Sequence, residues 1–367
     1  DEKSGFYCGQ DADSDGEEGK YYLFTPDEIG KVLGKEESNQ FCEWFGITKA
    51  GNFEGKSVPN LIANAKYAEK NEQIEADCRI LYDYRLKRTK LHKDDKVLVA
   101  WNALMISALA DAFVILQEPI YLKAAEDAQQ FISESLVNHQ TDRLCRRWRK
   151  GEAGITAQLD DYAFYAFALL KLYQATFEVF YLKEAVRYSK QMIDLFFDNE
   201  EGGFYLYAKD AESLIGRPKE TYDGAVPSGN SIAVAVLLWL FNLTGDVMWQ
   251  QLFKKQVVFY SGYLSDFPAG NCAALCALTR VLYPSQELIC VTSEDQAPLE
   301  LISFLHDHQK QLPFSVIKTK ANQQELMNAA PYTESYPIPA EGTAFYLCKD
   351  GKCSAPVTDL KILQQMI

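Results

Sequence analysis

The sequence predicts a mostly helical fold, in which two layers of helical hairpins form a ring and a small α/β segment follows near the C-terminus. Two observations predict this fold. Four long segments are apolar on nearly every side, and a helix of that kind must be buried all round. Three segments between them are charged on one face only, as expected of helices that cover the first set and face water. Hydrophobic residues make up 47% of the 367 residues, which is typical of a packed globular protein.

The first 96 residues contain clear signals for helix ends. Thr25-Pro26-Asp27-Glu28 is a capping box with proline at the first helical position, which predicts a helix from residue 25 to about residue 45. Gly46 then supplies the stop. A long polar helix is expected over residues 61–88.

The hairpins follow from residue 97 onward. The buried helices are expected at residues 97–116, 162–173, 231–243 and 272–282, and the half-buried ones at 119–137, 181–196 and 247–264. A short strand is expected at 202–207. Three strands are expected near the C-terminus, at 287–292, 314–319 and 343–348, with a helix between the first two. The expected organisation is therefore helical hairpins over 1–283, and an α/β excursion with a closing helix over 284–367, packed on the same ring.

Charge and composition exclude several classes of partner. A net charge of −14 argues against nucleic acid, because phosphate binding needs a clustered basic face. The basic run 143–150 is expected to be the solvated edge of a helix or turn. The longest apolar runs, such as 232–241, are shorter than a membrane span, so no membrane contact is expected. No glycine-rich phosphate loop is present, and no cofactor is expected.

Cysteine usage favours a cytoplasmic protein. Nine scattered cysteines are typical of reduced thiols rather than of a disulfide framework. Cys348 and Cys353 could pair or bind metal, but a buried or merely neighbouring pair of thiols is the expected state. No second cysteine or histidine pair completes a zinc set, so no metal is expected.

The run from Asp11 to Gly16 (DADSDG) is similar to the start of a calcium loop, in which alternate carboxylates converge on the ion and glycine permits a sharp turn. The twelfth position of that template needs a bidentate glutamate, and here it is Tyr22. We therefore expect the run to shape a loop, with Asp11 and Asp13 as further candidates for contact with a substrate.

The candidate active site lies where buried helices begin. Aspartates precede three of them, as Asp94-Asp95, Asp160-Asp161 and Asp223, and in a ring of hairpins these ends share one rim. Two carboxyl groups and aromatic platforms suffice for glycosidic chemistry. The catalytic candidates are Asp95, Asp161 and Asp223. The candidates for substrate binding are Asp94, Trp101, Asn102, Asp160, Tyr162, Tyr222, Ser228, Asn230, Asp11, Asp13 and Glu54. The alternative is that the aspartates cap helices and the aromatic rings pack in the core.

The order of the motifs resembles one family. They are Gly5-Phe6-Tyr7, Asp11-Ala12-Asp13-Ser14, Gly51-Asn52-Phe53-Glu54-Gly55, Trp101-Asn102, Asp161-Tyr162-Ala163, Gly202-Gly203-Phe204, Asp223-Gly224-Ala225 and Pro227-Ser228-Gly229-Asn230-Ser231. The chain resembles the C-terminal part of the spermatogenesis-associated protein 20 family, also described as thioredoxin-domain-containing proteins of the DUF255 group. It departs from the family pattern at Gln10 and Asp160, where the family has glutamate.

The resemblance implies an (α/α)6 toroid similar to six-hairpin glycosidases and N-acylglucosamine 2-epimerases, present here only in part. It also implies a thioredoxin-like domain upstream in the parent chain. The leading hypothesis is a carbohydrate-active or carbohydrate-binding toroid, similar to a glycoside hydrolase or a sugar isomerase, that takes a saccharide through its rim carboxylates. One alternative is a non-catalytic scaffold or binding module. The other is a toroid that presents a client to the thioredoxin-like domain.

Overall fold

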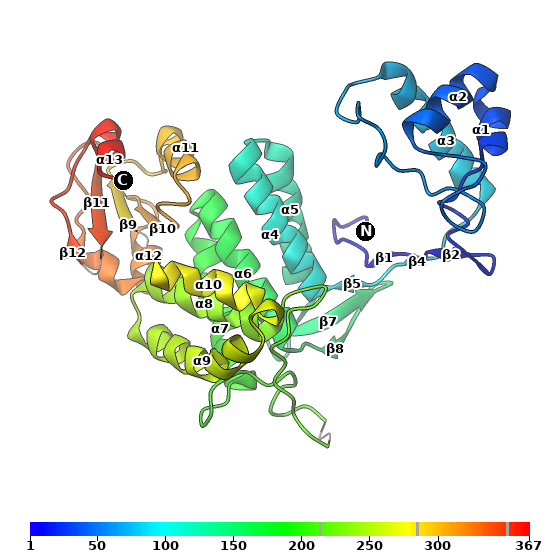
Figure 1. Cartoon of the computed structure of the whole chain (residues 1–367). Coiled ribbons are helices and arrows are strands. Elements are labelled where there is room, and N and C mark those ends of the chain that lie inside the picture. Colours follow the sequence, from blue (N-terminus) through cyan, green and yellow to red (C-terminus); the bar gives the residue numbers. More distant parts are fainter. Residues whose placement is uncertain (213–214, 284–285, 350–351) are drawn as a thin grey trace. The chain divides into compact units, whose positions relative to one another are not determined.

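The computed structural model describes residues 1–212, 215–283, 286–349 and 352–367 (Figure 1). Internal contacts divide the chain into two compact units, each of which is described by itself. The small unit is Cys8–Asp95, and the helical unit is Asp1–Tyr7 together with Lys96–Ile367. The predicted start of the α/β segment, Pro284, lies outside the described residues. That segment belongs to the helical unit.

The helical unit is built from helical hairpins, as predicted. Its helices are α4 (Val99–Leu116), α5 (Pro119–Ser135), α6 (Leu159–Thr176), α7 (Val179–Phe196), α8 (Gly229–Thr244), α9 (Val247–Asp266) and α10 (Cys272–Leu282). Each pair α4–α5, α6–α7 and α8–α9 packs together, and α4, α6, α8 and α10 contact one another in that order. The mostly helical fold class is therefore confirmed. Helices α6 and α8 are buried over most of their length, as predicted. The prediction of burial on all sides is wrong for α4 and α10, which expose apolar residues such as Ile115 and Leu282.

The same tight turn closes all three hairpins. Gln117 ends α4, Phe177 ends α6 and Gly245 ends α8, each in the left-handed conformation with φ of 58°, 57° and 67°. One further residue separates each of them from the next helix. A left-handed residue at this place satisfies the last carbonyl groups and reverses the chain at once, so the two helices of each hairpin run antiparallel.

Helix α4 is more apolar than the sequence analysis allowed for. By length and composition alone it could cross a membrane, with a mean hydropathy of 1.9 and 39% of the segment buried. The prediction that every apolar segment is too short is therefore wrong for α4. This is weak evidence for a membrane, because the core helix of a soluble protein meets the same criterion. Helix α4 packs on α5 and α6.

A four-stranded sheet follows the helices, and the three predicted strands are confirmed. The strands of the sheet are β9 (Glu287–Thr292), β10 (Phe314–Lys318), β11 (Thr343–Lys349) and β12 (Lys352–Cys353). The same segment also contains the helices α11 (Leu299–Asp307), α12 (Gln323–Ala329) and α13 (Leu360–Met366), and a 3-10 turn (Pro331–Ser335). The strand order is β10-β9-β11-β12, with β10 parallel to β9 and β11 antiparallel to β9. Phe314 of β10 contacts Trp239 of α8, so the sheet and the helices share one core.

The basic run at residues 143–150 is not the edge of a helix or turn. It forms β7 (Arg143–Arg149), which pairs with β8 (Glu152–Thr156), with β5 (Val97–Leu98) and with β6 (Val137–Asn138). Lys150 and Gly151 both have positive φ, 50° and 90°, which suits the two-residue turn of a hairpin. Four of the seven residues of β7 are arginines, so the sequence lacks the clear alternation of apolar and polar residues that predicts a strand.

The small unit contains three helices, α1 (Pro26–Leu33), α2 (Lys35–Trp44) and α3 (Glu72–Arg88), and the short strands β1 (Gly9–Gln10), β2 (Asp13–Ser14), β3 (Glu17–Glu18) and β4 (Lys93–Asp94). Thr25 caps α1 by accepting the N–H of Glu28, as predicted. The single helix expected over 25–45 is broken at Gly34, whose φ is 91°. The helix expected from residue 61 begins only at Glu72, because Asn71 caps it there.

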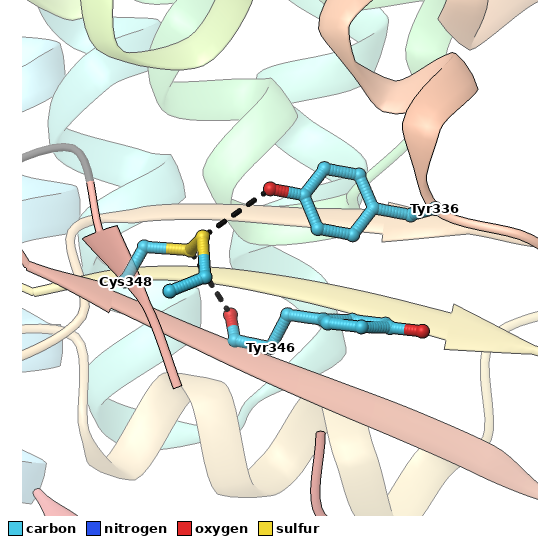
Figure 2. The surroundings of a disulfide bond; sticks show 4 residues. Tyr336, Tyr346 and Cys348 are labelled. Carbon is cyan, nitrogen blue, oxygen red and sulfur yellow. Dashed lines mark hydrogen bonds between the residues drawn. A yellow bond between two sulfur atoms is a disulfide. The ribbon is translucent and has the colours of Figure 1, made fainter. Parts of the chain in front are cut away.

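Cys348 and Cys353 form a disulfide between β11 and β12 (Figure 2). The hydroxyl of Tyr336 lies 3.3 Å from Cys353 Sγ, and Tyr346 contacts the ring of Tyr336 (Figure 2). The expectation that the cysteines are reduced is therefore wrong for this pair. The free cysteines among the described residues are Cys8, Cys42, Cys78, Cys145, Cys272, Cys276 and Cys290.

His306 joins two helix ends in the core. Its Nε2 lies 3.0 Å from the carbonyl oxygen of Ala175 in α6, and its Nδ1 lies 3.2 Å from Nε2 of Gln117 at the end of α4. Because a carbonyl only accepts, Nε2 carries the proton and Nδ1 accepts from Gln117. His306 is buried, although it lies on a helix whose neighbouring residue Asp307 is charged. Burial lowers its pKa.

This geometry predicts a loss of stability in mild acid. A histidine whose pKa is lowered on folding contributes stability that is present above its unfolded pKa of about 6.5 and is lost as the pH falls below it. We expect the free energy of unfolding to fall by at most about 1.4 kcal/mol per pH unit in that window. His306→Gln should flatten the acid side of a urea-unfolding profile, whereas replacing the exposed His139 by glutamine should not. Identical acid profiles for wild type and His306→Gln would contradict this account.

Candidate functional site

Asp161 links the starts of two inner helices. It lies in the first turn of α6, where its Oδ2 accepts the backbone N–H of Gln158 at 2.9 Å. Its Oδ1 accepts the N–H of Ala100 in the first turn of α4 at 3.1 Å. Both carboxyl oxygens are thus engaged by backbone donors at helix N-termini, where a negative charge is favourable.

Asp160 and Asp223 do the same for other helices. Asp160 Oδ1 accepts the N–H of Gly229 at the start of α8, at 2.9 Å. Asp223 precedes α8, and its Oδ1 accepts the N–H of Ser228 at 2.9 Å while its Oδ2 accepts that of Ala273 in α10 at 2.8 Å. The neighbouring carboxylates of α6 therefore serve different partners, α4 and α8, and Asp223 adds α10.

The rim carboxylates are thus structural anchors of the inner helices. The alternative of helix capping is supported for Asp160, Asp161 and Asp223. Each of them accepts an N–H at the start of a helix other than the one it lies on or precedes. Glycosidic chemistry needs carboxyl groups that can reach the substrate, one as an acid and one as a base or nucleophile. Asp161 is only 2% exposed. This arrangement therefore favours a positioning role over direct catalysis.

Burial also changes the proton affinity of these groups. It raises the pKa of Asp161 to about 7, opposed by the backbone N–H of Gln158 and by the charge of Arg146. Burial likewise raises the pKa of Asp160, opposed by the backbone N–H of Gly229. A raised carboxyl pKa is a common property of catalytic acids, but structural carboxyl groups in a core share it.

Two buried asparagines clasp the chain in the same way. Asn102 of α4 accepts the N–H of Phe6 at 2.8 Å and donates to its carbonyl at 3.0 Å. Asn230 of α8 accepts the N–H of Phe204 at 2.8 Å and donates to its carbonyl at 2.8 Å. Both phenylalanines stand in a Gly-Phe-Tyr sequence. Asn102 and Asn230 therefore hold backbone, and their contact with a substrate stays a prediction.

Ser228 also has a structural role. It is the N-cap of α8, where its hydroxyl oxygen accepts the N–H of Ser231 at 3.1 Å, and the hydroxyl lies 3.3 Å from that of Tyr260. A serine just ahead of an apolar segment, as in the Pro-Ser-Gly-Asn run, is a common N-cap. Ser228 is buried, so its hydroxyl stabilises the start of α8 and is not exposed at the surface.

The aromatic candidates fall into two groups. Tyr162 is buried against Tyr188 and Phe196, so it belongs to the core and is not a platform for a ligand. Trp101 of α4 is 49% exposed, and Tyr222 is 64% exposed. Tyr222 is the better platform, because its ring lies parallel to that of Phe267 with 4° between the planes.

The loop that carries Tyr222 is fixed from both sides. The N–H of Asp223 donates to the carbonyl of Gly270 at 2.7 Å, and the Asp223 carboxylate holds α10. A side chain at Gly270 would collide with the rings of Phe267 and Tyr222, with contacts of 2.4 and 3.0 Å. A glycine is therefore required where the two rings meet the chain.

Five predicted site residues lie in the small unit, which is described by itself. Asp94 belongs to β4, and Asp95 follows it. Asp11 accepts the N–H of Asp13, and the next residues form a hairpin whose turn, Asp15 and Gly16, has φ of 53° and 78°. This is the Asp-Gly turn that tight hairpins favour. Glu54 has a φ of 46° in another turn.

The Asp11 run therefore forms a hairpin turn, which is the loop-shaping role that the sequence predicts. Among the described residues, no group of three or more histidine, cysteine or carboxylate side chains could hold a metal ion. The joint role of Asp94, Asp95 and Glu54 with the rim of the helical unit stays a prediction.

One ion pair near the rim was missed by the sequence analysis. Lys219 lies 2.7 Å from Asp198 and also donates to the carbonyl of Gly202, and both charged side chains are largely buried. The hydroxyl of Tyr205 donates to the same carboxylate, and Lys219 chiefly holds the pKa of Asp198 well below its usual range. The repeated Gly-Phe-Tyr sequence could have drawn attention to this ion pair, because its second copy contains Tyr205, which donates to Asp198.

The sequence has relatives among curated proteins. It is 27% identical to human spermatogenesis-associated protein 20 over 99% of this chain and 52% of that protein. It is also 27% identical to the protein of the same name from Rattus norvegicus, again over 99% of this chain and 52% of the relative. The resemblance inferred from the motifs is confirmed, and the chain spans about half the length of the curated relatives it matches. No family model matches the sequence.

Solved structures with a similar arrangement include carbohydrate-active enzymes. Cellobiose 2-epimerase from Bacillus thermoamylovorans is 15% identical with a TM-score of 0.43, over 72% of this chain and 68% of that one. A GH76 α-mannanase from Bacteroides thetaiotaomicron is 13% identical with a TM-score of 0.42, over 65% of this chain and 70% of that one.

Proposed function

We propose that this chain, which is similar to spermatogenesis-associated protein 20, binds a saccharide without transforming it. The binding surface is the aromatic pair Tyr222 and Phe267, which are 64% and 54% exposed. The observation that carries the proposal is this exposed, parallel pair on a loop that Asp223 anchors. An aromatic face is a suitable surface for the apolar face of a sugar ring.

The rim carboxylates support binding rather than hydrolysis. Hydrolysis requires two carboxyl groups that reach the glycosidic bond from opposite sides. Asp161 and Asp223 each use both carboxyl oxygens to accept backbone N–H groups at helix starts. These carboxylates are therefore not available to act on a glycosidic bond. In this account their function is to keep the Tyr222 loop and the inner helices in place.

The decisive experiment is a glycan library screened against the purified chain. We expect saturable binding of at least one saccharide, weakened about fivefold by Tyr222→Ala, as the loss of an aromatic contact of about 1 kcal/mol implies. Tyr67→Ala is the matched control, because Tyr67 is 67% exposed in the small unit. Its affinity should equal that of the wild type.

Two results would favour the other functions. Release of a sugar product or an epimer, lost in a folded Asp161→Asn variant, would support an enzyme. A failure to bind any saccharide would support a protein-binding scaffold. That a thioredoxin-like domain of the longer protein acts on a client held by this part remains a separate proposal, tested by deleting that domain from the full-length protein.

A further inference from the structure

We propose a second binding site, in the small unit, for a small amphipathic carboxylate: an apolar chain or ring that ends in one carboxyl group. The site is a cleft of about 690 Å³ formed by α2, α3 and the segments around Phe24 and Pro59. Cavities that hold small ligands usually measure about 300–1,000 Å³. The proposal is independent of saccharide binding by the helical unit.

The floor of the cleft is apolar. It is formed by Phe24, Phe41, Phe45 and Leu81, which belong to the hydrophobic core of the small unit. The rings of Phe41 and Phe45 lie 4.6 Å apart. Such a floor would remove the apolar part of a ligand from water, and it offers little to a sugar or a free phosphate.

One face of α3 supplies the polar wall. Cys78, Tyr82 and Arg85 are spaced by four and three residues, so they lie on one side of the helix. Arg79 and Asp83 also line the cleft. Two guanidinium groups against one carboxylate leave the wall net positive, in a chain whose net charge is −14. The wall therefore selects a ligand with a single negative charge.

Arg85 is the residue that points most clearly to an anion. Its guanidinium lies 4.5 Å from the centre of the Tyr21 ring and 5.5 Å from that of Tyr82, which hold it in place. Its Nε is buried, and within the described part of the chain it has no hydrogen-bond acceptor. An arginine fork matches a carboxylate through two parallel hydrogen bonds.

Arg88, one turn further along α3, shows the contrast. It pairs with Glu28 at 2.6 Å and donates to the carbonyls of Leu23, Lys20 and Tyr21. Arg88 is thus committed to holding the unit together. Arg85 faces the cleft and retains donors for a ligand.

Dodecanoate is the probe, added to the full chain below its micelle concentration and measured by calorimetry. We expect saturable one-to-one binding, weakened about tenfold or more by Arg85→Gln, since charge-assisted hydrogen bonds are lost. Arg79→Gln should also weaken it. Lys87→Gln is the matched control, because this exposed lysine of α3 does not line the cleft. Dodecanol, with the same chain and no charge, should bind far more weakly than dodecanoate.

Cys78 provides a second readout at the site itself. It is exposed on the wall, so dodecanoate should slow its alkylation by N-ethylmaleimide, followed by mass spectrometry. Cys272, exposed in the helical unit, should react at an unchanged rate. Equal effects of dodecanol and dodecanoate, equal protection of both cysteines, or no binding would overturn the proposal. If Arg85→Gln fails to fold, Arg79→Gln decides the question, because Arg79 is exposed.

Discussion

Replacing Asn230 by alanine is expected to lower the free energy of unfolding of the helical unit by about 3–5 kcal/mol, which is large for one substitution. Asn230 is fully buried. Its side chain accepts from Phe204 N–H and Gln256, and donates to the carbonyls of Phe204 and Glu220. Alanine would remove the side-chain partner of the Phe204 N–H and of the carbonyls of Phe204 and Glu220, and each unpaired buried group costs about 1–3 kcal/mol. Gln256 would keep its hydrogen bond to the backbone carbonyl of residue 230.

Urea unfolding followed by tryptophan fluorescence measures this effect. Asn242→Ala is the matched control in the same helix, because among the described residues the Asn242 amide donates only to the carbonyl of Leu238, one turn earlier. That variant should cost about 1 kcal/mol or less. Equal costs for the two variants would show that the clasp on Phe204 does not stabilise the fold.

The second large effect concerns pH and Asp161. Its pKa rises from 3.8 to about 7 on folding, so the folded state holds more protons than the unfolded state between these values. Stability from this group is therefore greatest at low pH and falls as the pH rises from about 4 to about 7, by roughly 4 kcal/mol at 1.36 kcal/mol per unit. Asparagine does not titrate, and its side chain has one acceptor oxygen where the aspartate uses two.

We therefore expect Asp161→Asn to be less stable than the wild type near pH 4, because it keeps one of the two hydrogen bonds, and to gain on the wild type as the pH rises toward 8. The difference between their urea midpoints, taken at each pH, isolates this residue from other titrating groups. If instead the wild type becomes more stable relative to the variant as the pH rises, the two backbone N–H donors lower the pKa of Asp161 by more than burial raises it. It would then be the carboxylate, and not the acid, that holds α4 and α6.

Signals that act within a few residues could be read from the sequence. Thr25 and Ser228 cap the helices that follow them, because the hydroxyl and the N–H it accepts are three residues apart. Breaks were harder to predict. Gly34 lies in a pattern that otherwise favours one helix, and only its φ of 91° separates α1 from α2.

Candidate residues at helix starts could be read from the sequence, but their contacts could not. The aspartates were recognised at helix starts, where capping is common. Their partners are distant in sequence, since Asp161 meets Ala100 across 61 residues and Asp160 meets Gly229 across 69. A single sequence contains no signal for such pairings. For the same reason the sequence could not show that Tyr162 is buried and Tyr222 exposed.

The anchoring carboxylates also bear on how the helical unit opens. Asp160 and Asp161 are adjacent, yet they hold α8 and α4, so α6 is the shared support of both neighbours. Fraying of the first turn of α6 would release both helix starts together. The amide hydrogens of Ala100 and Gly229 should then exchange with solvent deuterium as one cooperative group, with nearly equal protection.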